Sequence, residues 1–208
     1  MIALSLDTTG HACTAALVNE HGVIASRCDD IGRGHDAHLA PMVADMFKEA
    51  GFSPADIHRI AVCTGPGSFT GQRVGLSFAR GLALPHKIPV LGFSCFDVWA
   101  AQNDPERTRN ILTVADVRRG QLCWAYYENG QIKHRPKTDD ADVAKAAFNS
   151  LPKYQRVQDE PISGPILAWL GLDRQPQDYP AAPLYSRAPD AKLPGGKSLP
   201  PAKALSET

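Results

Sequence analysis

The chain has 208 residues, of which 43% are hydrophobic and 21% are charged. These values are ordinary for a folded protein and exclude an intrinsically disordered one. Lys and Arg together number 22, and Asp and Glu together also number 22. No net charge therefore draws the chain to nucleic acid. No apolar run of about 20 residues is present, and the N-terminus lacks the basic region of a signal peptide. We therefore expect a cytoplasmic protein that does not bind membranes, with its five cysteines reduced and mostly buried.

The first half of the chain alternates between apolar strands and helices. Three short apolar segments separated by glycine-containing turns predict an antiparallel meander, and the later strand–helix–strand order predicts parallel neighbours in the same sheet. The predicted elements are strands at 2–6, 12–18, 23–28, 59–64 and 88–93, and helices at 38–50 (with Pro41 in its first turn), 69–84 and 94–102.

A second set of strands follows at 110–116 and 121–127, with a third short strand after Gly130. The first strand of this set ends in Asp116, a glycine turn follows, and an apolar strand returns, just as in the hairpin that contains Asp7. The repetition predicts two related lobes, although any two hairpins share some likeness. We therefore predict a first lobe at 1–104, a reduced second lobe at 105–188 and a flexible, proline-rich tail at 189–208. Short helices are expected at 140–150 and 162–172.

Two stretches could hold a phosphate group or a nucleotide. A glycine-rich loop between a strand and a helix offers backbone N–H groups to an anion, and an Asp at a strand end beside hydroxyl groups can hold a hydrated metal ion and phosphate oxygens. The alternatives are a tight strand-to-helix turn and an Asp that stabilises its own turn. The candidate residues are Gly65, Gly67, Ser68, Thr70 and Gly71 in the loop, Asp7, Thr8 and Thr9 at the first strand end, and Asp116 in the second lobe.

Other sites receive little support from the sequence. His35 and His38 are three residues apart without a third ligand nearby, and the basic run Lys133–Lys137 is typical of a solvated strand edge. The loop at 65–75 is neither a Walker A loop nor a dinucleotide fingerprint, and GxSxG, HExxH and CxxC are absent from the sequence. We predict no catalytic residues and no metal site.

The strand end SLDTT, the stretch GPGSFTGQRVGLSFARGLA, the segment DVRRGQLCWAYY and the ending PLYSR together resemble the TsaB (YeaZ) family over roughly residues 1–127 and 183–187. The resemblance implies a two-lobed actin-like, RNase-H-like (ASKHA) α/β fold, and a non-catalytic partner subunit of the TsaD transferase that forms threonylcarbamoyl-adenosine beside the anticodon of tRNA. It also implies a TsaE-like ATPase as a further partner, tRNA contact only through the complex, and no cofactor of its own, with ATP or ADP held at the partner interface. The metal-binding HxxxH of TsaD-like enzymes is missing here. An active actin-like ATPase or phosphotransferase remains the alternative, whereas a protease lacks a nucleophile–base pair.

The helices at 38–50 and 69–84 carry apolar residues over an arc wider than packing on one sheet requires. The resemblance places the TsaD contact on these helices. The alternative is that the second lobe or the tail buries the surplus apolar residues. The same face could pair two copies of the isolated chain. We expect Met42 and Leu76 to face outward. The predicted interface residues are Leu39, Met42, Val43, Met46, Val74, Leu76 and Phe78.

Overall fold

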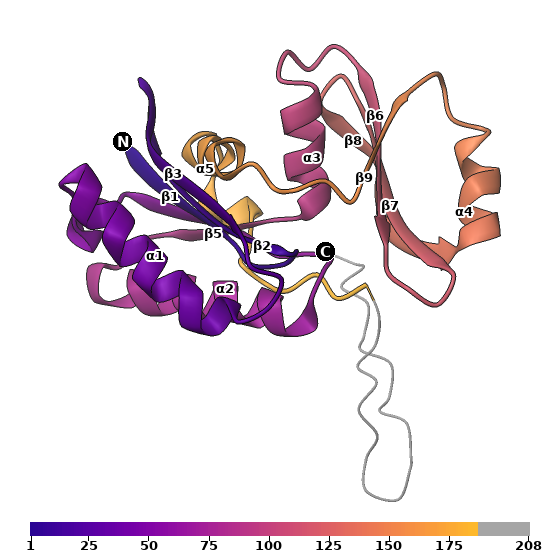
Figure 1. Cartoon of the computed structure of the whole chain (residues 1–208). Coiled ribbons are helices and arrows are strands. Elements are labelled where there is room, and N and C mark those ends of the chain that lie inside the picture. Colours follow the sequence, from indigo (N-terminus) through magenta and orange to yellow (C-terminus); the bar gives the residue numbers. More distant parts are fainter. Residues whose placement is uncertain (187–208) are drawn as a thin grey trace, which may run out of the picture.

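The computed structural model describes residues 1–186, which form two β-sheets with helices around and between them (Figure 1). The strands are β1 Ile2–Asp7, β2 Ala12–Asn19, β3 Gly22–Asp30, β4 Arg59–Cys63, β5 Val90–Phe93, β6 Asn110–Asp116, β7 Gln121–Glu128, β8 Gln131–Asp140 and β9 Gln155–Gln158. The helices are α1 His35–Ala50, α2 Phe69–Ala83, α3 Cys95–Asn103, α4 Ala141–Phe148 and α5 Gly164–Asp173, with single 3-10 turns at Pro54–Asp56, Leu84–His86 and Pro176–Asp178.

The first sheet has the order β3-β2-β1-β4-β5. β1 pairs antiparallel with β2 and parallel with β4, and β4 pairs parallel with β5. Five of the six residues of β1 are buried, as expected of a strand that is covered on both faces. The predicted meander that leads into parallel strands is confirmed.

The second sheet repeats this arrangement with one strand fewer. Its order is β8-β7-β6-β9, with β6 antiparallel to β7 and parallel to β9. β6, β7, β8 and β9 therefore occupy the places of β1, β2, β3 and β4, which confirms the predicted duplication and the two-lobed α/β class. β9 was not predicted from the sequence, because its four residues QRVQ include only one apolar side chain.

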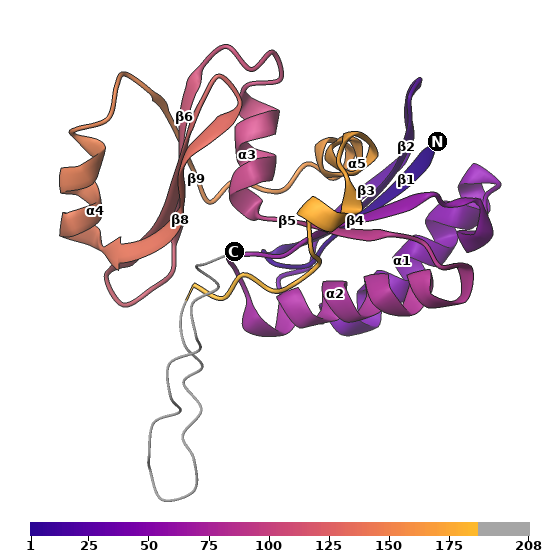
Figure 2. The same cartoon turned by 180° about the vertical axis from the view of Figure 1, so that it is seen from behind.

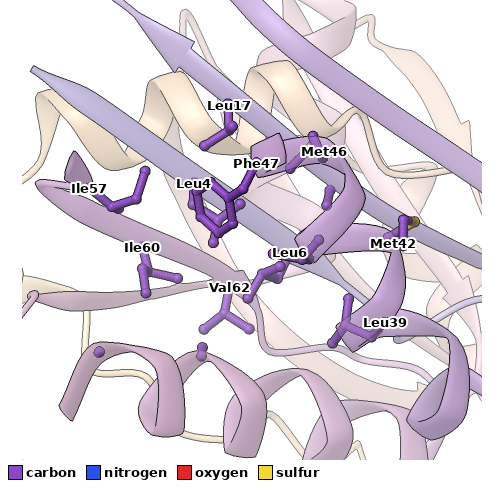
Figure 3. Packing of buried hydrophobic residues seen from close by; sticks show 14 of the residues in the cluster. Leu4, Leu6, Leu17, Leu39, Met42, Met46, Phe47, Ile57, Ile60 and Val62 are labelled. Carbon is purple, nitrogen blue, oxygen red and sulfur yellow. The ribbon is translucent and has the colours of Figure 1, made fainter. Parts of the chain in front are cut away.

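Helices α1 and α2 lie side by side on one face of the first sheet (Figures 1 and 3). Met42 and Leu76 are buried, with 6% and 3% of their surface exposed, so the expectation that they face outward is wrong. Leu39, Val43 and Met46 are buried in the same cluster with Leu4, Leu6, Ile60 and Val62. The wide apolar arc of α1 is buried within the first lobe, because this helix contacts both the sheet and α2.

α1 also begins earlier than its pattern predicts. It starts at His35, after Gly34 in the left-handed conformation (φ 84°), so Pro41 lies inside the helix rather than in its first turn. The exposed face of α1 carries small residues at Ala37, Ala40 and Ala44.

The opposite face of the first sheet is covered by α5 (Figure 2). α5 contacts β1, β2 and β4, and the hydroxyl group of Ser5 donates a hydrogen bond to the carbonyl oxygen of Gly164 at 2.7 Å. The boundary predicted at 105–188 for the second lobe is therefore wrong for this helix, which returns to the first lobe. An apolar sequence such as PILAWLGL offers no polar face, so the helix requires burial.

Helix α3 lies between the two sheets, and α4 covers the outer face of the second (Figure 2). Phe96, Trp99 and Leu167 belong to a core cluster that also contains Phe93 of the first sheet and Ile111 of the second. The lobes therefore share apolar contacts rather than joining only through the chain.

Residues 174–186 continue along the edge of the first sheet. The N–H group of Gly92 donates to the carbonyl oxygen of Tyr179, and that of Leu184 donates to Thr64. The ring of Tyr185 packs on Phe69. Most of this segment therefore packs on the first lobe, although the carbonyl oxygen of Ser186 accepts a hydrogen bond from the Thr138 hydroxyl group of β8 at 3.1 Å. The predicted tail at 189–208 lies outside the described residues. In residues 1–186, no helix is long and apolar enough to cross a membrane.

Candidate functional site

The carboxyl end of β1 forms the floor of a cleft between the lobes. Asp7 is 2% exposed, and its Oδ1 accepts hydrogen bonds from the Thr9 N–H at 2.9 Å and the Thr9 hydroxyl group at 2.7 Å. Burial raises the pKa of Asp7 above its usual value, although the two Thr9 hydrogen bonds oppose this shift. The floor therefore holds a carboxyl group that is already bonded within its own turn.

The glycine-rich loop packs directly on this turn. The Ser68 N–H donates to the carbonyl oxygen of Thr9 at 2.8 Å, and the Thr8 hydroxyl group donates to the carbonyl oxygen of Gly71 at 2.6 Å. A Cβ atom at Gly67 or Gly71 would collide with the backbone of the turn. Glycine is thus required at both positions for close approach of two backbone segments.

The loop also starts α2. Ser68 is the N-cap, and its hydroxyl oxygen accepts a hydrogen bond from the Gly71 N–H at 3.1 Å. The N–H groups of Ser68 and Gly71 are therefore not available to an anion. The alternative of a tight strand-to-helix turn accounts for these contacts.

The opposite wall comes from the second lobe. Asp116 is exposed at the end of β6; its Oδ1 accepts from the Arg118 N–H at 2.8 Å, and its own N–H donates to Asp159 Oδ1 at 3.2 Å. The chain from Asp159 to Ile162 continues along this wall toward α5.

Between these walls lies a cavity of about 770 Å³. Five carboxylic acids line it, namely Asp7, Asp30, Asp116, Asp159 and Glu160, together with Arg118 and His11. The charged side chains of the lining are therefore predominantly acidic, which does not favour a phosphate group on its own. Among the described residues, no group of three or more His, Cys, Asp or Glu side chains is placed to hold a metal ion.

The structure brings together only part of the predicted set. Asp7, Thr9, Gly67, Ser68 and Asp116 line the cleft, whereas Thr8, Gly65, Thr70 and Gly71 do not. Asp30, Asp159 and Glu160 also line the cleft and were not predicted. Asp30 ends a strand as Asp7 does, which is a signal that could have been used, but the placement of Asp159 depends on β9, which was not predicted.

The two histidines considered as metal ligands have other surroundings. His38 Nε2 lies 2.7 Å from Asp29 Oδ2, which ties the first turn of α1 to β3. His35 is buried, and its Nε2 atom has no hydrogen-bond partner in the described part of the chain.

A second surface of interest lies on the outer sides of α1 and α2. Val74 and Phe78 are half-buried and, with Leu82, form an apolar row at i, i+4 spacing along α2. The neighbouring exposed face of α1 carries Ala37, Ala40 and Ala44. Of the seven predicted interface residues, only Val74 and Phe78 thus remain partly accessible to a partner.

Comparison with known proteins gives consistent matches. The family model "TsaD: tRNA N6-adenosine threonylcarbamoyltransferase" matches residues 23–163. The tRNA threonylcarbamoyladenosine biosynthesis protein TsaB of Escherichia coli is 38% identical over 144 residues, which are 67% of this chain and 61% of that protein. An uncharacterized protein of Mycobacterium tuberculosis is 31% identical over 91% of this chain and 93% of its own length.

A solved structure, YeaZ from Pseudomonas aeruginosa, has 26% sequence identity and a TM-score of 0.67, covering 88% of this chain and 99% of that one. A second structure from the same organism, described as similar to peptidase YEAZ, has a TM-score of 0.72 at 24% identity, which shows a shared fold.

Proposed function

Because the chain belongs to the TsaB (YeaZ) family, we propose that it acts in the biosynthesis of threonylcarbamoyladenosine in tRNA. In this proposal it is the non-catalytic partner subunit of a TsaD-type transferase and works in the cytoplasm. The partner carries out the transfer, and this chain supports it by binding.

The observation that carries the non-catalytic role is the state of the cleft floor. Asp7 is buried and bonded to Thr9, and the hydroxyl groups of Thr8 and Ser68 bond to or cap α2. These three groups, which could hold a phosphate group in an active enzyme, are thus committed to internal hydrogen bonds. The sequence also lacks the HxxxH pair of TsaD-like enzymes.

The outer sides of α1 and α2 provide the partner surface in this proposal. The apolar row of Val74, Phe78 and Leu82 can be buried against a partner's helices, and the alanine face of α1 allows those helices to approach closely. Burial of apolar groups without charges is typical of the centre of a stable interface. The same surface can pair two copies of the isolated chain until the partner displaces one.

Three further interactions are implied by the family and remain part of the proposal. A TsaE-like ATPase joins the assembly, and ATP or ADP binds at the interface with the partner rather than to a site of this chain alone. Transfer RNA is bound only through the complex, since the chain has equal numbers of basic and acidic residues.

The test is a binding measurement between the purified chain and the TsaD-type protein of the same organism. Phe78→Asp is expected to weaken the complex at least tenfold, because the centre of an interface tolerates an unpaired charge poorly. Val143→Asp is the matched control, because Val143 is an apolar residue on α4 that is 57% exposed and distant in the fold from α2. Unchanged affinity of the Phe78→Asp variant would place the interface elsewhere.

Activity separates this proposal from the alternative of an active ATPase or phosphotransferase. The isolated chain is expected to hydrolyse no ATP, whereas the mixture with the partner and its substrates forms the modified tRNA. Steady ATP turnover by the pure chain, lost in Asp7→Ala, would contradict the non-catalytic role.

A further inference from the structure

Two free cysteines meet beneath the cleft. Cys63 is the last residue of β4, Cys95 is the first residue of α3, and their Sγ atoms lie 3.4 Å apart. The two residues are 32 positions apart in the sequence, so the fold, not the local chain, brings them together. We propose that Cys63 and Cys95 form a redox-sensitive dithiol that closes to an intramolecular disulfide.

The distance between the sulfur atoms supports closure. A disulfide bond is about 2.05 Å long, so closure requires the two sulfur atoms to approach each other by roughly 1.35 Å. Cys95 donates a weak hydrogen bond to the carbonyl oxygen of Pro66 at 3.2 Å. Cys63 interacts with the buried carboxyl group of Asp7 and with the backbone of Gly65. The Thr9 hydroxyl group lies 3.7 Å from Cys63 Sγ and 3.5 Å from Cys95 Sγ.

The cleft determines which cysteine reacts first. Cys95 lines the cavity of about 770 Å³ although only 2% of its surface is exposed, whereas Cys63 is 1% exposed and does not line it. A small oxidant in the cleft therefore meets Cys95 first. Burial, followed by the contact with Cys95 and the nearby Asp7, raises the pKa of the Cys63 thiol well above its usual value. The Cys63 thiol ionises less readily and is therefore the slower of the two to attack a peroxide. It serves as the second, resolving thiol, and it gives up its proton as it attacks the oxidised Cys95.

The chemistry balances with a peroxide as the oxidant. The Cys95 sulfur attacks hydrogen peroxide, the O–O bond breaks, and Cys95 becomes a sulfenic acid while one water leaves. The Cys63 sulfur then attacks the sulfenic sulfur, the S–O bond breaks, and the hydroxyl group departs with the Cys63 proton as a second water. The two thiols are oxidised to a disulfide, and the peroxide is reduced to two water molecules.

The bond would act on the cleft floor. It would tie the end of β4 to the start of α3, and α3 contacts β6 of the second sheet. It would also remove both thiol groups from the Thr9 hydroxyl, which bonds to Asp7. The oxidation state of the pair would thereby be linked to the turn that forms the floor.

The experiment uses the full chain carrying Cys28→Ser, because Cys28 is exposed and would otherwise react by itself. Hydrogen peroxide is expected to remove two of the remaining four thiols and to lower the intact mass by about 2 Da, reversibly with dithiothreitol. Peptide mapping is expected to find the link between Cys63 and Cys95. Adding Cys63→Ser or Cys95→Ser abolishes the mass loss, and adding Cys123→Ser does not.

Circular dichroism establishes that each serine variant is folded, and Cys63→Ala replaces Cys63→Ser if the buried hydroxyl group destabilises the chain. A link from Cys95 to Cys123, or a mass increase at Cys95 by sulfinic acid without any cross-link, would overturn the proposal. So would four unchanged thiols after peroxide treatment of the folded Cys28→Ser chain.

Discussion

The two sheets have the same strand order, yet they bury their equivalent acids differently. β1 ends in Asp7 and β6 ends in Asp116, and each Asp accepts a hydrogen bond from the backbone N–H two residues later. Asp7 is 2% exposed, whereas Asp116 is exposed to solvent. Because both lobes have this hairpin, the hairpin by itself does not explain why the Asp7 carboxyl group is buried.

The difference lies in the segment that comes after the fourth strand of each sheet. After β4 the glycine-rich loop turns back over the end of β1 and leads into α2, which contacts both β1 and β4. After β9 the chain leaves directly for α5, which packs on the first sheet instead. The second lobe therefore has no counterpart of α2 in the described residues, and its strand ends stay open to the cleft.

The helices after the third strands differ in the same way. α1 has 16 residues and buries a broad face, whereas α4 has 8 residues and buries only Ala144 and Phe148. The first lobe has the more complete helical cover, and substitutions in each lobe test how far this controls stability.

The largest effect is expected for Met42→Asp in α1. Met42 lies in the core cluster of the first lobe, so an unpaired charge there should lower the free energy of unfolding by at least about 4 kcal/mol. Val143→Asp in α4 should change it by less than about 0.5 kcal/mol, because that side chain is 57% exposed. Urea unfolding followed by circular dichroism measures both. A stable Met42→Asp variant that fails only in partner binding would restore the outward-facing interpretation of this residue.

A smaller effect is expected for Gly71→Ala, which places a Cβ atom against the carbonyl oxygen of Thr8. We expect a loss of about 3 kcal/mol, because both segments are backbone and cannot move aside easily. Gly81→Ala is the control within the same helix: no atom lies within 4 Å of the added Cβ, and alanine should stabilise α2 by about 1 kcal/mol. Equal stability of the two variants would show that the loop moves away from the turn at little cost.

The smallest effect concerns Asp7 and its dependence on pH. Because burial raises the pKa of Asp7 in the folded state, the folded protein retains this proton at pH values where the unfolded chain, with a pKa of about 3.9, has lost it. The contribution of Asp7 to stability is thus greatest below the unfolded pKa and falls as the pH rises through the folded pKa.

Asp7→Asn keeps an oxygen for the Thr9 hydrogen bonds and has no charge, so at neutral pH it should be more stable than the original chain by more than about 0.5 kcal/mol. This gain should shrink as the pH falls and vanish below about pH 3, where the unfolded chain is protonated as well. Asp116→Asn, at the equivalent and exposed position, should differ by less than about 0.5 kcal/mol throughout. Unfolding curves at several pH values measure the differences, and a gain at acidic rather than neutral pH would contradict the raised pKa.

Much of the fold could be predicted from the sequence because its signals are local. The strands around Leu4 and Val62 are short apolar runs bounded by turns, and the row from Leu39 to Ala50 repeats at helical spacing. The duplicated hairpins, whose first strands end in Asp7 and Asp116, also indicated the second lobe. Periodicity and turn residues act over a few positions, so they can be interpreted without knowing the neighbours.

Only the tertiary structure decided which apolar faces are used and which polar groups meet. The apolar arc of α1 that contains Met42 would be equally wide if a second helix or a partner protein covered it. The contact between α1 and α2 shows that a second helix of the same chain covers Met42. The return of α5 to the first sheet, the entry of Asp159 into the cleft and the meeting of Cys63 with Cys95 each join segments far apart in the chain. Such contacts depend on how the elements pack against one another, and a pattern within one segment carries no information about its neighbour across the core.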